Sequence, residues 1–312
     1  MLSVSSFGEV LIDLIPNDDG SLTPYVGGAP ANVAAAVAKL GGDSCFIGGI
    51  SHDGFGLKIR ACLEQLGVRY HHSLLVKNKT ALVAVSLDGD GERSFEFYRD
   101  NTADLSVNSS KLAKLVWSAT DIFHFCSNTL VDASMREATL FALKQMHEVG
   151  GIVSFDVNLR LNLWPEDSLQ SVIEVLNQAF SFCHIVKFSR EELEFYCQRT
   201  EQSKTQSLQY MFELGVETVI VTDGGNEIEL RSASDIARVQ PPISSVKDTT
   251  AGGDSFVGGL LFQLAKLSKP ELLKTVTQIE KMQELVKFAA KCGAFTVARK
   301  GAIEALPSAS DI

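Results

Sequence analysis

The sequence of 312 residues predicts an α/β fold in which a mainly parallel central sheet is flanked by helices on both faces. Short apolar segments of strand length alternate with longer segments of helical period, as in sheets whose parallel strands are joined by crossover helices. Glycine pairs at Gly41–Gly42 and Gly150–Gly151 follow two helical segments and are typical of helix C-termini. The expected strands are 4–15, 45–50, 122–126, 152–157, 185–188 and 218–222, and the expected helices are 31–40, 55–66, 135–149, 169–180 and 256–265.

One segment departs from this alternation. Two strand-like stretches, 80–87 and 94–99, flank the Asp-Gly turn D-G-D-G-E-R and predict a β-hairpin. Phe97 and Arg99 fall on one face of its second strand, which therefore carries an aromatic ring and a cation. The hairpin is either a lid that closes over a polar ligand or a plain edge extension of the sheet.

Composition and charge narrow the class of protein. A net charge of −10, with no run of Lys or Arg, argues against a nucleic-acid-binding surface. No apolar run approaches the length of a membrane span, the N-terminus lacks a signal pattern, and the six cysteines are scattered, so we expect a cytoplasmic protein without membrane contact. Because no proline- or serine-rich linker divides the chain, we expect a single domain, 1–312, with the hairpin as an insertion at about 80–100.

The stretch K-D-T-T-A-G-G-D-S-F carries the strongest local signal for chemistry. It places Gly252, Gly253 and Asp254 at the start of a predicted helix. Open backbone N–H groups at a helix N-terminus suit a phosphate, whereas a carboxylate at the same place repels one. Two interpretations stay open: Asp254 accepts a proton from a hydroxyl that attacks the bound anion, or it caps its own helix.

A second group of polar residues lies near the N-terminus. Asp13 interrupts an apolar strand, and a buried Asp is rare unless it is paired or used. Gly27 and Gly28 allow a ligand to approach the backbone, and Asn32 follows in the first turn of a helix, where its amide can both donate and accept. Asp13 and Asn32 together would suit a neutral, hydroxyl-rich molecule, although an Asn at a helix start also has a purely structural use.

Three later strands are followed or interrupted by further candidates. Arg160 in S-F-D-V-N-L-R could clamp a phosphate or a polar substrate, or could lie on the surface. Glu192 in K-F-S-R-E-E could hold Mg²⁺ mostly through water, or could be a solvated helix charge. Thr222 and Gly224, in V-T-D-G-G-N, offer a strand end and a tight turn where a nucleotide could lie.

With these motifs in hand, the chain resembles the ribokinase-like (PfkB) carbohydrate kinases, and within that family the fructokinases. The resemblance runs nearly end to end, and its motifs stand in the family's order. They are G-E-V-L-I-D-L-I-P, G-G-A-P-A-N-V-A, D-G-E-R-S-F-E-F-Y-R, S-F-D-V-N-L-R-L-N-L-W-P, D-T-T-A-G-G-D-S-F and A-R-K-G-A-I-E-A-L-P. The resemblance implies a ribokinase-like fold with a small β-strand lid. It also implies transfer of the γ-phosphoryl group of ATP to a sugar hydroxyl, with Mg²⁺ as cofactor.

The resemblance also implies a role for each matched residue. Asp254 matches the catalytic base, and Ala251, Gly252 and Gly253 fall in the anion hole beside it. Glu192 falls on the Glu of an N-x-x-E motif linked to Mg²⁺. The implied sugar contacts are Asp13, Gly27, Gly28, Asn32, Phe97, Arg99 and Arg160, and the implied nucleotide contacts are Lys187, Thr222, Gly224 and Gly252.

The chain departs from the family's usual pattern at three places. The usual G-A-G-D reads A-G-G-D, so Ala251 stands where glycine is usual and Gly252 where alanine is usual. Alanine resists a positive φ, so an anion hole that needs one there must be strained or rebuilt. Ser189 replaces the Asn of N-x-x-E, and the nucleotide loop lacks its usual second glycine, with Glu227 near that place.

We therefore predict an ATP-dependent fructokinase that forms fructose 6-phosphate. Two other acceptors, 2-keto-3-deoxygluconate and an aminoimidazole riboside, stay open because relatives with these motifs use them. From a different class, the chain could be a kinase-like regulator that binds a sugar without turning it over. The sequence leaves open whether a monovalent cation such as K⁺ assists, and whether the lid pairs two copies into a homodimer.

Overall fold

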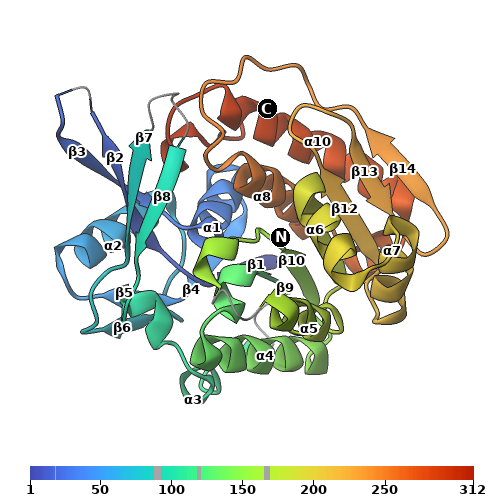
Figure 1. The fold of residues 1–312 in the computed structure, drawn as a ribbon, viewed down its shortest axis with the longest axis horizontal. Helices are drawn as coiled ribbons and strands as arrows, with labels where there is room; N and C mark the ends of the chain where they lie inside the picture. The colour runs from blue at the N-terminus through green and yellow to red at the C-terminus, as the bar shows by residue number, and fades with distance from the viewer. Residues whose placement is uncertain (18, 88–92, 118–120, 165–168) are drawn as a thin grey trace.

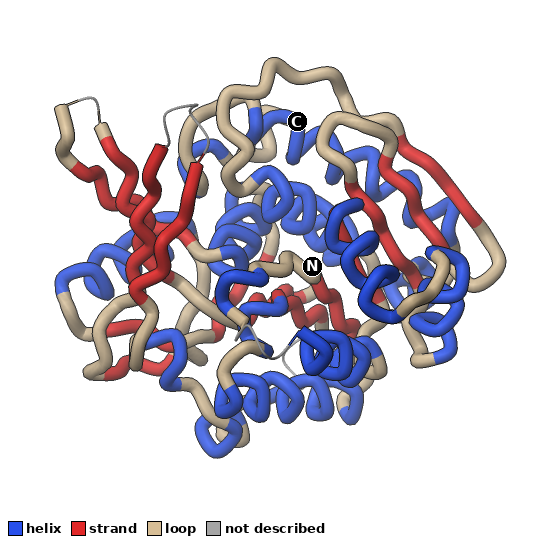
Figure 2. The backbone as a smooth tube through the Cα atoms, viewed as in Figure 1, coloured by secondary structure: helices blue, strands red, loops and turns tan. Residues whose placement is uncertain are grey.

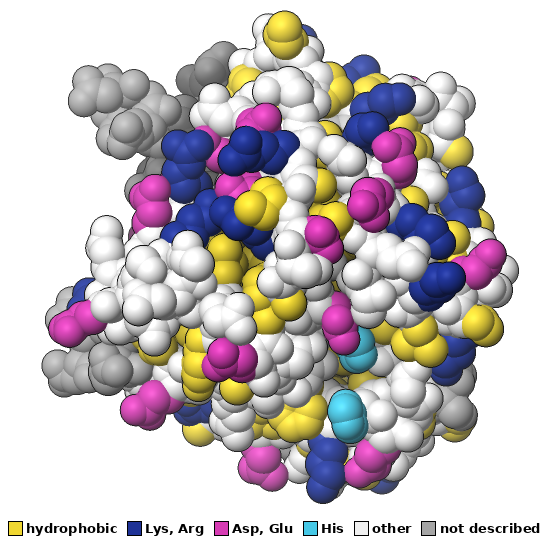
Figure 3. Space-filling view, turned by 90° about the vertical axis from the view of Figure 1, so that its right-hand side faces the viewer, with side chains coloured by type: hydrophobic (Ala, Val, Ile, Leu, Met, Phe, Trp, Pro, Cys, Tyr) yellow, Lys and Arg dark blue, Asp and Glu magenta, His cyan; other side chains and the backbone are white. Residues whose placement is uncertain are grey.

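The computed structural model describes the whole chain except residues 18, 88–92, 118–120 and 165–168. The turn of the expected hairpin, 88–92, therefore lies outside the described residues. Within the described part of the chain, no helix is both long enough and apolar enough to cross a membrane. On the face drawn in Figure 3, Lys and Arg side chains are interspersed with Asp and Glu.

An eight-stranded sheet runs through the middle of the molecule and confirms the predicted α/β fold (Figure 1). Its strand order is β14-β13-β12-β11-β10-β9-β1-β4. The strands from β4 to β12 are parallel, and β13 and β14 add an antiparallel edge. The strands are β1 (Ser3–Phe7), β4 (Asp43–Ile47), β9 (Ile122–Cys126), β10 (Ile152–Asp156), β11 (Ile185–Ser189), β12 (Thr218–Thr222), β13 (Ile228–Arg231) and β14 (Ile236–Val239).

Helices cover both faces of this sheet, as Figure 2 shows. They are α1 (Ala29–Lys39), α2 (Gly54–Leu66), α3 (Ser109–Leu112), α4 (Ala133–Glu148), α5 (Leu169–Phe180), α6 (Arg190–Thr200), α7 (Lys204–Glu213), α8 (Gly252–Ala265), α9 (Lys269–Thr275) and α10 (Ile279–Val297). One core joins the sheet to α4, α5, α6 and α7, and the other joins it to α1, α8, α9 and α10. Successive side chains of a strand point to opposite faces of the sheet, so Ile152 and Val153 belong to different cores.

A second, four-stranded sheet stands beside the central one, at the left of Figure 1. Its order is β3-β2-β7-β8, with β2 (Leu11–Pro16), β3 (Leu22–Gly27), β7 (Leu82–Leu87) and β8 (Arg93–Tyr98). The antiparallel pair β7–β8 is the expected hairpin, and β2 joins it by pairing in parallel with β7. We call this sheet the lid. It is built from two separate stretches of the chain rather than from the hairpin alone.

Two expected strands are wrong, because each is divided between two sheets. The expected strand 4–15 breaks after Phe7, where Gly8 adopts φ +147 and the chain leaves the central sheet for the lid. The expected strand 45–50 breaks at Gly48, after which β5 (Gly49–Ser51) pairs with β6 (Leu74–Val76) in a small sheet of their own. The apolar pattern runs through both breaks, so only the glycines mark them. Asp13 consequently lies in the lid strand β2 and not in the central sheet.

Candidate active site

A cleft of about 920 Å³ opens at the carboxyl ends of the central strands, with residues of the lid on its other wall. This edge of a parallel sheet is where ligands bind in α/β proteins, and the volume suits a small ligand. The predicted site residues that line it are Asp13, Gly28, Asn32, Phe97, Arg160, Lys187, Glu192, Thr222, Ala251, Gly253 and Asp254. The predicted residues outside its lining are Gly27, Arg99, Gly224 and Gly252.

Asp254 lies in the first turn of α8 and is only 8% exposed. Asn32, in the first turn of α1, donates a hydrogen bond from Nδ2 to Oδ2 of Asp254 at 2.8 Å. The two helices approach closely because Gly258 faces α1, where an added Cβ would lie 2.4 Å from that of Ala36. The start of α8 has no side-chain capping hydrogen bond, so the geometry gives no support to a helix-capping role for Asp254.

Burial raises the pKa values of several carboxyl groups in the cleft, among them Asp254 and Asp13. Burial raises the pKa of Asp254 to about 6, although the hydrogen bond from Asn32 opposes this change. Burial, reinforced by the negative charges of Asp254 and Glu304, raises the pKa of Asp13 to about 7. A general base works best when its pKa lies near the working pH, so the environment of Asp254 suits proton abstraction near neutrality.

Glycine is required at the end of β3 and directly after it, because neighbouring atoms leave no room for a side chain at Gly27 or Gly28. An added Cβ on Gly27 would lie 2.1 Å from Oδ2 of Asp13, so Gly27 makes room for that carboxylate instead of lining the cleft. Gly28 adopts φ +105, and a Cβ there would lie 2.7 Å from the carbonyl oxygen of Glu9. Asn32, in the first turn of α1, has a buried Oδ1 without a hydrogen-bond partner among the described residues. This wall of the cleft therefore presents acceptor oxygens.

The start of α8 forms the candidate anion hole. Ala251 adopts φ 57 and ψ 9, the left-handed conformation that alanine resists, so the position does require a positive φ and holds a strained alanine. The first bond of the helical series runs from Ser255 N–H to the Ala251 carbonyl. The N–H groups of Gly253 and Asp254 precede it and have no acceptor within the helix. The N–H of Gly252, in contrast, donates to the Thr249 carbonyl at 3.3 Å.

Gly252 is fixed by a neighbour that sequence analysis did not consider. An added Cβ on Gly252 would lie 2.6 Å from Cγ1 of Val297, at the end of α10. The backbone carbonyl of Val297 also accepts hydrogen bonds from the N–H groups of Lys247 and Asp248, in the loop that leads to the anion hole. The exchange of glycine and alanine is thus a local rearrangement, in which Val297 fills space beside the second position.

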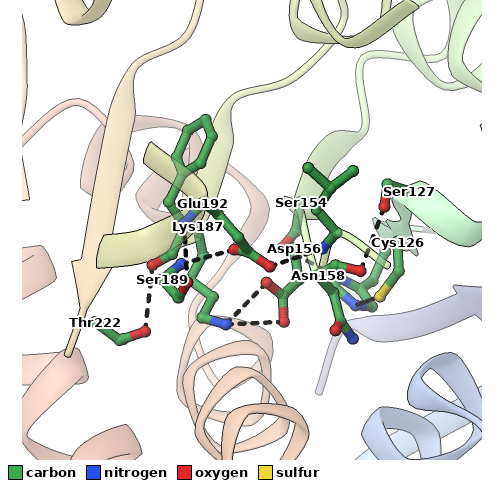
Figure 4. Close-up of polar contacts among 12 residues, drawn as sticks. Cys126, Ser127, Ser154, Asp156, Asn158, Lys187, Ser189, Glu192 and Thr222 are labelled. Atoms are coloured by element: carbon green, nitrogen blue, oxygen red, sulfur yellow. Dashed lines mark hydrogen bonds and ion pairs between the residues drawn. The ribbon is translucent and has the colours of Figure 1, made fainter. Parts of the chain in front are cut away.

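A buried cation lies beside the anion hole. Nζ of Lys187 bonds both carboxylate oxygens of Asp156, at 2.9 and 3.2 Å, and would lie 3.4 Å from a Cβ on Gly253 (Figure 4). Burial opposes the charge of Lys187, but Asp156 and, more weakly, Glu192 raise its pKa above the ordinary value, so it stays a cation. This pair joins the ends of β10 and β11, whose residues Asp156 and Lys187 stand opposite each other in the sheet.

Glu192 ties two loops together. Its Oε1 accepts from the Leu159 N–H and its Oε2 from the Ser189 N–H, each at 2.7 Å (Figure 4). Ser189 in turn caps α6 by accepting from the Glu192 N–H, which completes a capping box. Ser189, in place of the family's usual Asn, therefore has a clear structural role. Within the described residues, no group of three or more His, Cys, Asp or Glu side chains is placed to hold a metal ion.

The remaining predicted residues on this side divide between the cleft and the surface. The hydroxyl of Thr222 lies at the cleft and donates to the Phe188 carbonyl at 3.2 Å. Gly224 adopts φ +54 in an exposed turn beyond the cleft lining. Arg160 is exposed, yet it lines the cleft and lies near enough to Asp254 to oppose the rise of that group's pKa.

Phe97 and Arg99 separate at the end of the lid. Phe97 lines the cleft, whereas its neighbour Tyr98 is 54% exposed on the other face of the strand. Arg99 lies just beyond β8, and its buried guanidinium forms an ion pair with the buried carboxylate of Asp104. Arg99 is not among the residues that line the cleft, and its predicted contact with the sugar stays a prediction.

Glu9 and Asn128 were not among the site residues expected from the sequence. Glu9 and Asn128 are 2% and 8% exposed, line the cleft and bond to each other, from Asn128 Nδ2 to Glu9 Oε1 at 3.0 Å. Glu9 was hidden inside the segment expected to be one continuous strand. A glutamate within an apolar run was nevertheless as unusual a signal as Asp13 in the same run.

Comparison with known proteins agrees with this geometry. Residues 1–309 match the model of the pfkB family carbohydrate kinases. The chain is 36% identical to the probable fructokinase-5 of Arabidopsis thaliana over 99% of this chain and 95% of that one. A fructokinase from Xylella fastidiosa, solved with bound ATP, superposes with a TM-score of 0.94 at 34% identity, covering 99% of this chain and 96% of that one.

A second solved structure carries both a sugar and a nucleotide. It is a double mutant of the fructokinase from Vibrio cholerae O395, with fructose, ADP and potassium ion bound. It superposes with a TM-score of 0.88 at 34% identity, covering 100% of this chain and 97% of that one. The predicted resemblance is therefore confirmed, and the chain belongs to the pfkB family of carbohydrate kinases.

Proposed function

We propose that this chain is an ATP-dependent fructokinase that transfers the γ-phosphoryl group of ATP to the 6-hydroxyl of D-fructose. The observation that carries the proposal is the setting of Asp254. A buried carboxylate with a pKa near neutrality is oriented by Asn32 at the start of α8, beside N–H groups and a buried cation. Acceptance of a proton and stabilisation of a phosphoryl group are thus available at one point of the cleft. Fructokinases with similar chains and folds support the choice of sugar.

Asp254 would accept the proton of the attacking hydroxyl. Its Oδ2 already accepts from Asn32, which fixes the carboxylate and leaves Oδ1 for the sugar. Asp13 and Asn32 would bind other hydroxyls of the sugar. Near neutral pH Asp13 is close to half-protonated, so it can both donate and accept. Phe97 would cover the sugar from the lid side.

The transferred phosphoryl group would lie against the start of α8. Phosphoryl transfer needs positioning and charge stabilisation more than covalent chemistry. The N–H groups of Gly253 and Asp254 point from the positive end of the helix dipole, and the ammonium of Lys187 adds a full charge beside Gly253. Arg160 would neutralise charge from the open side of the cleft.

The acidic groups near Lys187 fit a Mg²⁺ ion that arrives with the nucleotide and keeps much of its water. Both oxygens of Glu192 accept backbone hydrogen bonds, and Asp156 is held by Lys187, so these carboxylates would hold the ion through water molecules rather than directly. The ion would supply neutralisation of the phosphate charge. Thr222 would lie near the nucleotide, and the exposed turn at Gly224 would border it.

The decisive experiment replaces Asp254 by Asn and measures sugar-dependent ADP release. Loss of a positioned general base should lower kcat by about 10² to 10⁴-fold, while the Kd for fructose changes little. Asp132→Asn is a matched control, because that carboxylate caps α4 outside the cleft and Asn caps equally well. Near-normal turnover in a folded Asp254→Asn protein would refute the assignment.

A panel of acceptors distinguishes the rival functions. Glu9, Asp13 and Asp254 all line the cleft, and in their ionised forms they would repel the carboxylate of 2-keto-3-deoxygluconate. We therefore expect the highest kcat/KM with fructose, above that with the sugar acid or with aminoimidazole riboside. Measurable sugar binding without ADP release from any of them would favour a regulator that does not catalyse.

We also propose that the lid mediates a homodimer and that the protein is cytoplasmic. Leu22 and Tyr98 are 51% and 54% exposed on the lid, whose outer strands β3 and β8 are open edges. All six cysteines are free thiols, as expected in a reducing compartment. Light scattering of the wild type and of Tyr98→Glu would test the dimer, which the charged variant should dissociate.

A further inference from the structure

Glu9 and Asn128 meet because of strand register. β1 and β9 are parallel neighbours, with Phe7 opposite Phe125, and each strand ends at the cleft. Glu9 follows the end of β1 and Asn128 follows the end of β9, so both side chains reach the same part of the wall. Their hydrogen bond, from Asn128 Nδ2 to Glu9 Oε1 at 3.0 Å, uses one polar atom of each.

The second polar atom of each side chain has no hydrogen-bond partner in the part of the chain that the structure describes. Among the described residues, Oε2 of Glu9 and Oδ1 of Asn128 are buried and form no hydrogen bond. Buried acceptors left without donors are costly, and they are rare in folded proteins. Burial raises the pKa of Glu9, while the nearby guanidinium of Arg99 opposes that rise. Two acceptors of this kind on a cleft wall indicate that a ligand supplies the donors.

The chemistry of the missing donor is restricted. A hydroxyl can donate to Oε2 or Oδ1 and can accept in return, for example from Nη2 of Arg99, which is likewise buried and without a partner among the described residues. A carboxylate or phosphate offers only acceptors and would be repelled by Glu9. The same arrangement would be met by a neutral polyol but not by a sugar acid.

We propose that Glu9 and Asn128 form a specificity element that binds one or two hydroxyls of the acceptor sugar and selects neutral ketoses over sugar acids. The inference rests on the proposed sugar kinase function and adds to it a second pair of sugar contacts, besides Asp13 and Asn32, which line the same cleft. Neither Glu9 nor Asn128 takes part in proton or phosphoryl transfer. Their effect should therefore appear in sugar affinity and discrimination rather than in the chemical step.

The test compares Glu9→Gln and Asn128→Leu with the wild type. Glu9→Gln keeps the shape but replaces one acceptor by a donor, and Asn128→Leu removes Oδ1 and the partner of Glu9. Ser127→Ala is the matched control, because its buried hydroxyl bonds the Asn158 carbonyl and it lies outside the cleft lining. For each protein, calorimetry gives the Kd of D-fructose, its epimers at carbons 3, 4 and 5, and 1-deoxy-D-fructose, and ADP release gives kcat and KM.

We expect each variant to weaken fructose binding by about 10 to 100-fold, as for loss of a hydrogen bond to a charged or buried group, with kcat within about threefold of wild type. For the hydroxyl that Glu9 or Asn128 binds, the wild type should bind the corresponding epimer or deoxy sugar more weakly than fructose, and in the variant this difference in Kd should nearly vanish. The differences in Kd for changes at the other carbons should persist. An equal loss for every sugar would overturn the inference, since it would indicate a structural role. Unchanged fructose affinity would also overturn it, since it would mean that only water fills the site.

The two readouts separate this inference from the function on which it rests. Wild-type protein that binds fructose without releasing ADP would refute the proposed kinase activity, while the Kd comparison would still decide the role of Glu9 and Asn128. Absence of binding to every sugar of the panel would refute both. A variant is included in the comparison only if it is folded, which is shown by a melting temperature close to that of Ser127→Ala.

Discussion

Exchanging the residues at positions 251 and 252 tests the structure of the anion hole. Ala251→Gly with Gly252→Ala would restore the family's usual order. The first change removes the strain of an alanine at φ 57, whereas the second introduces a Cβ that would lie 2.6 Å from Cγ1 of Val297. We expect the two changes to have opposite effects, and a third change, Val297→Ala, to relieve the second.

The magnitudes follow from the backbone conformation and the contact. The left-handed conformation of an alanine costs the folded protein about 1–2 kcal/mol. Glycine avoids this cost but increases the conformational entropy of the unfolded chain, which lowers stability by about 0.4–1 kcal/mol. Ala251→Gly should therefore raise the free energy of unfolding by up to about 1.5 kcal/mol. Overpacking against Val297 should cost Gly252→Ala about 1–3 kcal/mol. Because an ordinary carbon contact is about 3.5–4.0 Å, relief requires a shift approaching 1 Å. A misplacement of that size can cost about 100-fold in rate.

Thermal unfolding and ADP release measure the two effects on the same proteins. Ala251→Gly should keep kcat within about threefold and raise Tm by a few degrees, at about 2 °C per kcal/mol. The double variant should lose about 10 to 100-fold in kcat, and the triple variant should recover most of it. A double variant with wild-type kcat and Tm would refute the reasoning, because Val297 would then yield without cost.

Three further predictions follow from the charged groups of the cleft. Asp254 must be ionised to act as a base, and its pKa is about 6. The value of kcat/KM should therefore be constant above about pH 7 and should fall tenfold for each pH unit well below pH 6. A constant kcat/KM down to pH 5 would contradict the assignment. Asp13 has a pKa of about 7 in the folded protein and an ordinary, lower pKa in the unfolded chain. The unfolded chain therefore releases this proton at lower pH, and the folded protein loses stability as the pH rises toward and through 7. Asp13→Asn should therefore gain on the order of 2–3 kcal/mol relative to wild type between pH 5 and 8 in denaturant titrations, and a pH-independent difference would disprove it. Glu192→Gln leaves one backbone N–H without an acceptor, which should lower the free energy of unfolding by about 1–3 kcal/mol and raise the KM for MgATP. Glu191→Gln is the control: this side chain is exposed, and its replacement should change neither quantity.

Periodicity predicted most of the fold because the elements of this chain carry their own signals. Alternation of apolar strands and helical segments was sufficient for the parallel strands of the central sheet and for α1, α2, α4, α5 and α8, whereas β13, β14, α6, α7 and α9 were not among the expected elements. It failed where the apolar pattern continued while the backbone turned, at Gly8 and at Gly48, since a single glycine inside an apolar run does not distinguish a bend from a strand. The lid was consequently predicted as one hairpin instead of two.

The candidate site was predictable where one residue type has few other uses. Asp254 after two glycines, and Asp13 inside an apolar run, were such cases. The pairing of Lys187 with Asp156 depends on strand register, and the ion pair of Arg99 with Asp104 depends on the path of the chain beyond the lid. Neither is encoded in local spacing. The left-handed conformation of Ala251 is contrary to the preference of alanine, so only the structure could reveal it.

The way in which the lid is attached limits how it can move. Four backbone connections join it to the rest of the molecule, at Gly8–Val10, at Gly28, at 77–81 and at 99–102. A sheet held by four backbone connections is less free to rotate than a flap on a single hinge. Glu9 and Gly28 lie in two of these connections, whereas Phe97 lies within the lid strand β8. A movement of the lid would therefore displace Phe97 relative to the central sheet more than it displaces Glu9 or Gly28.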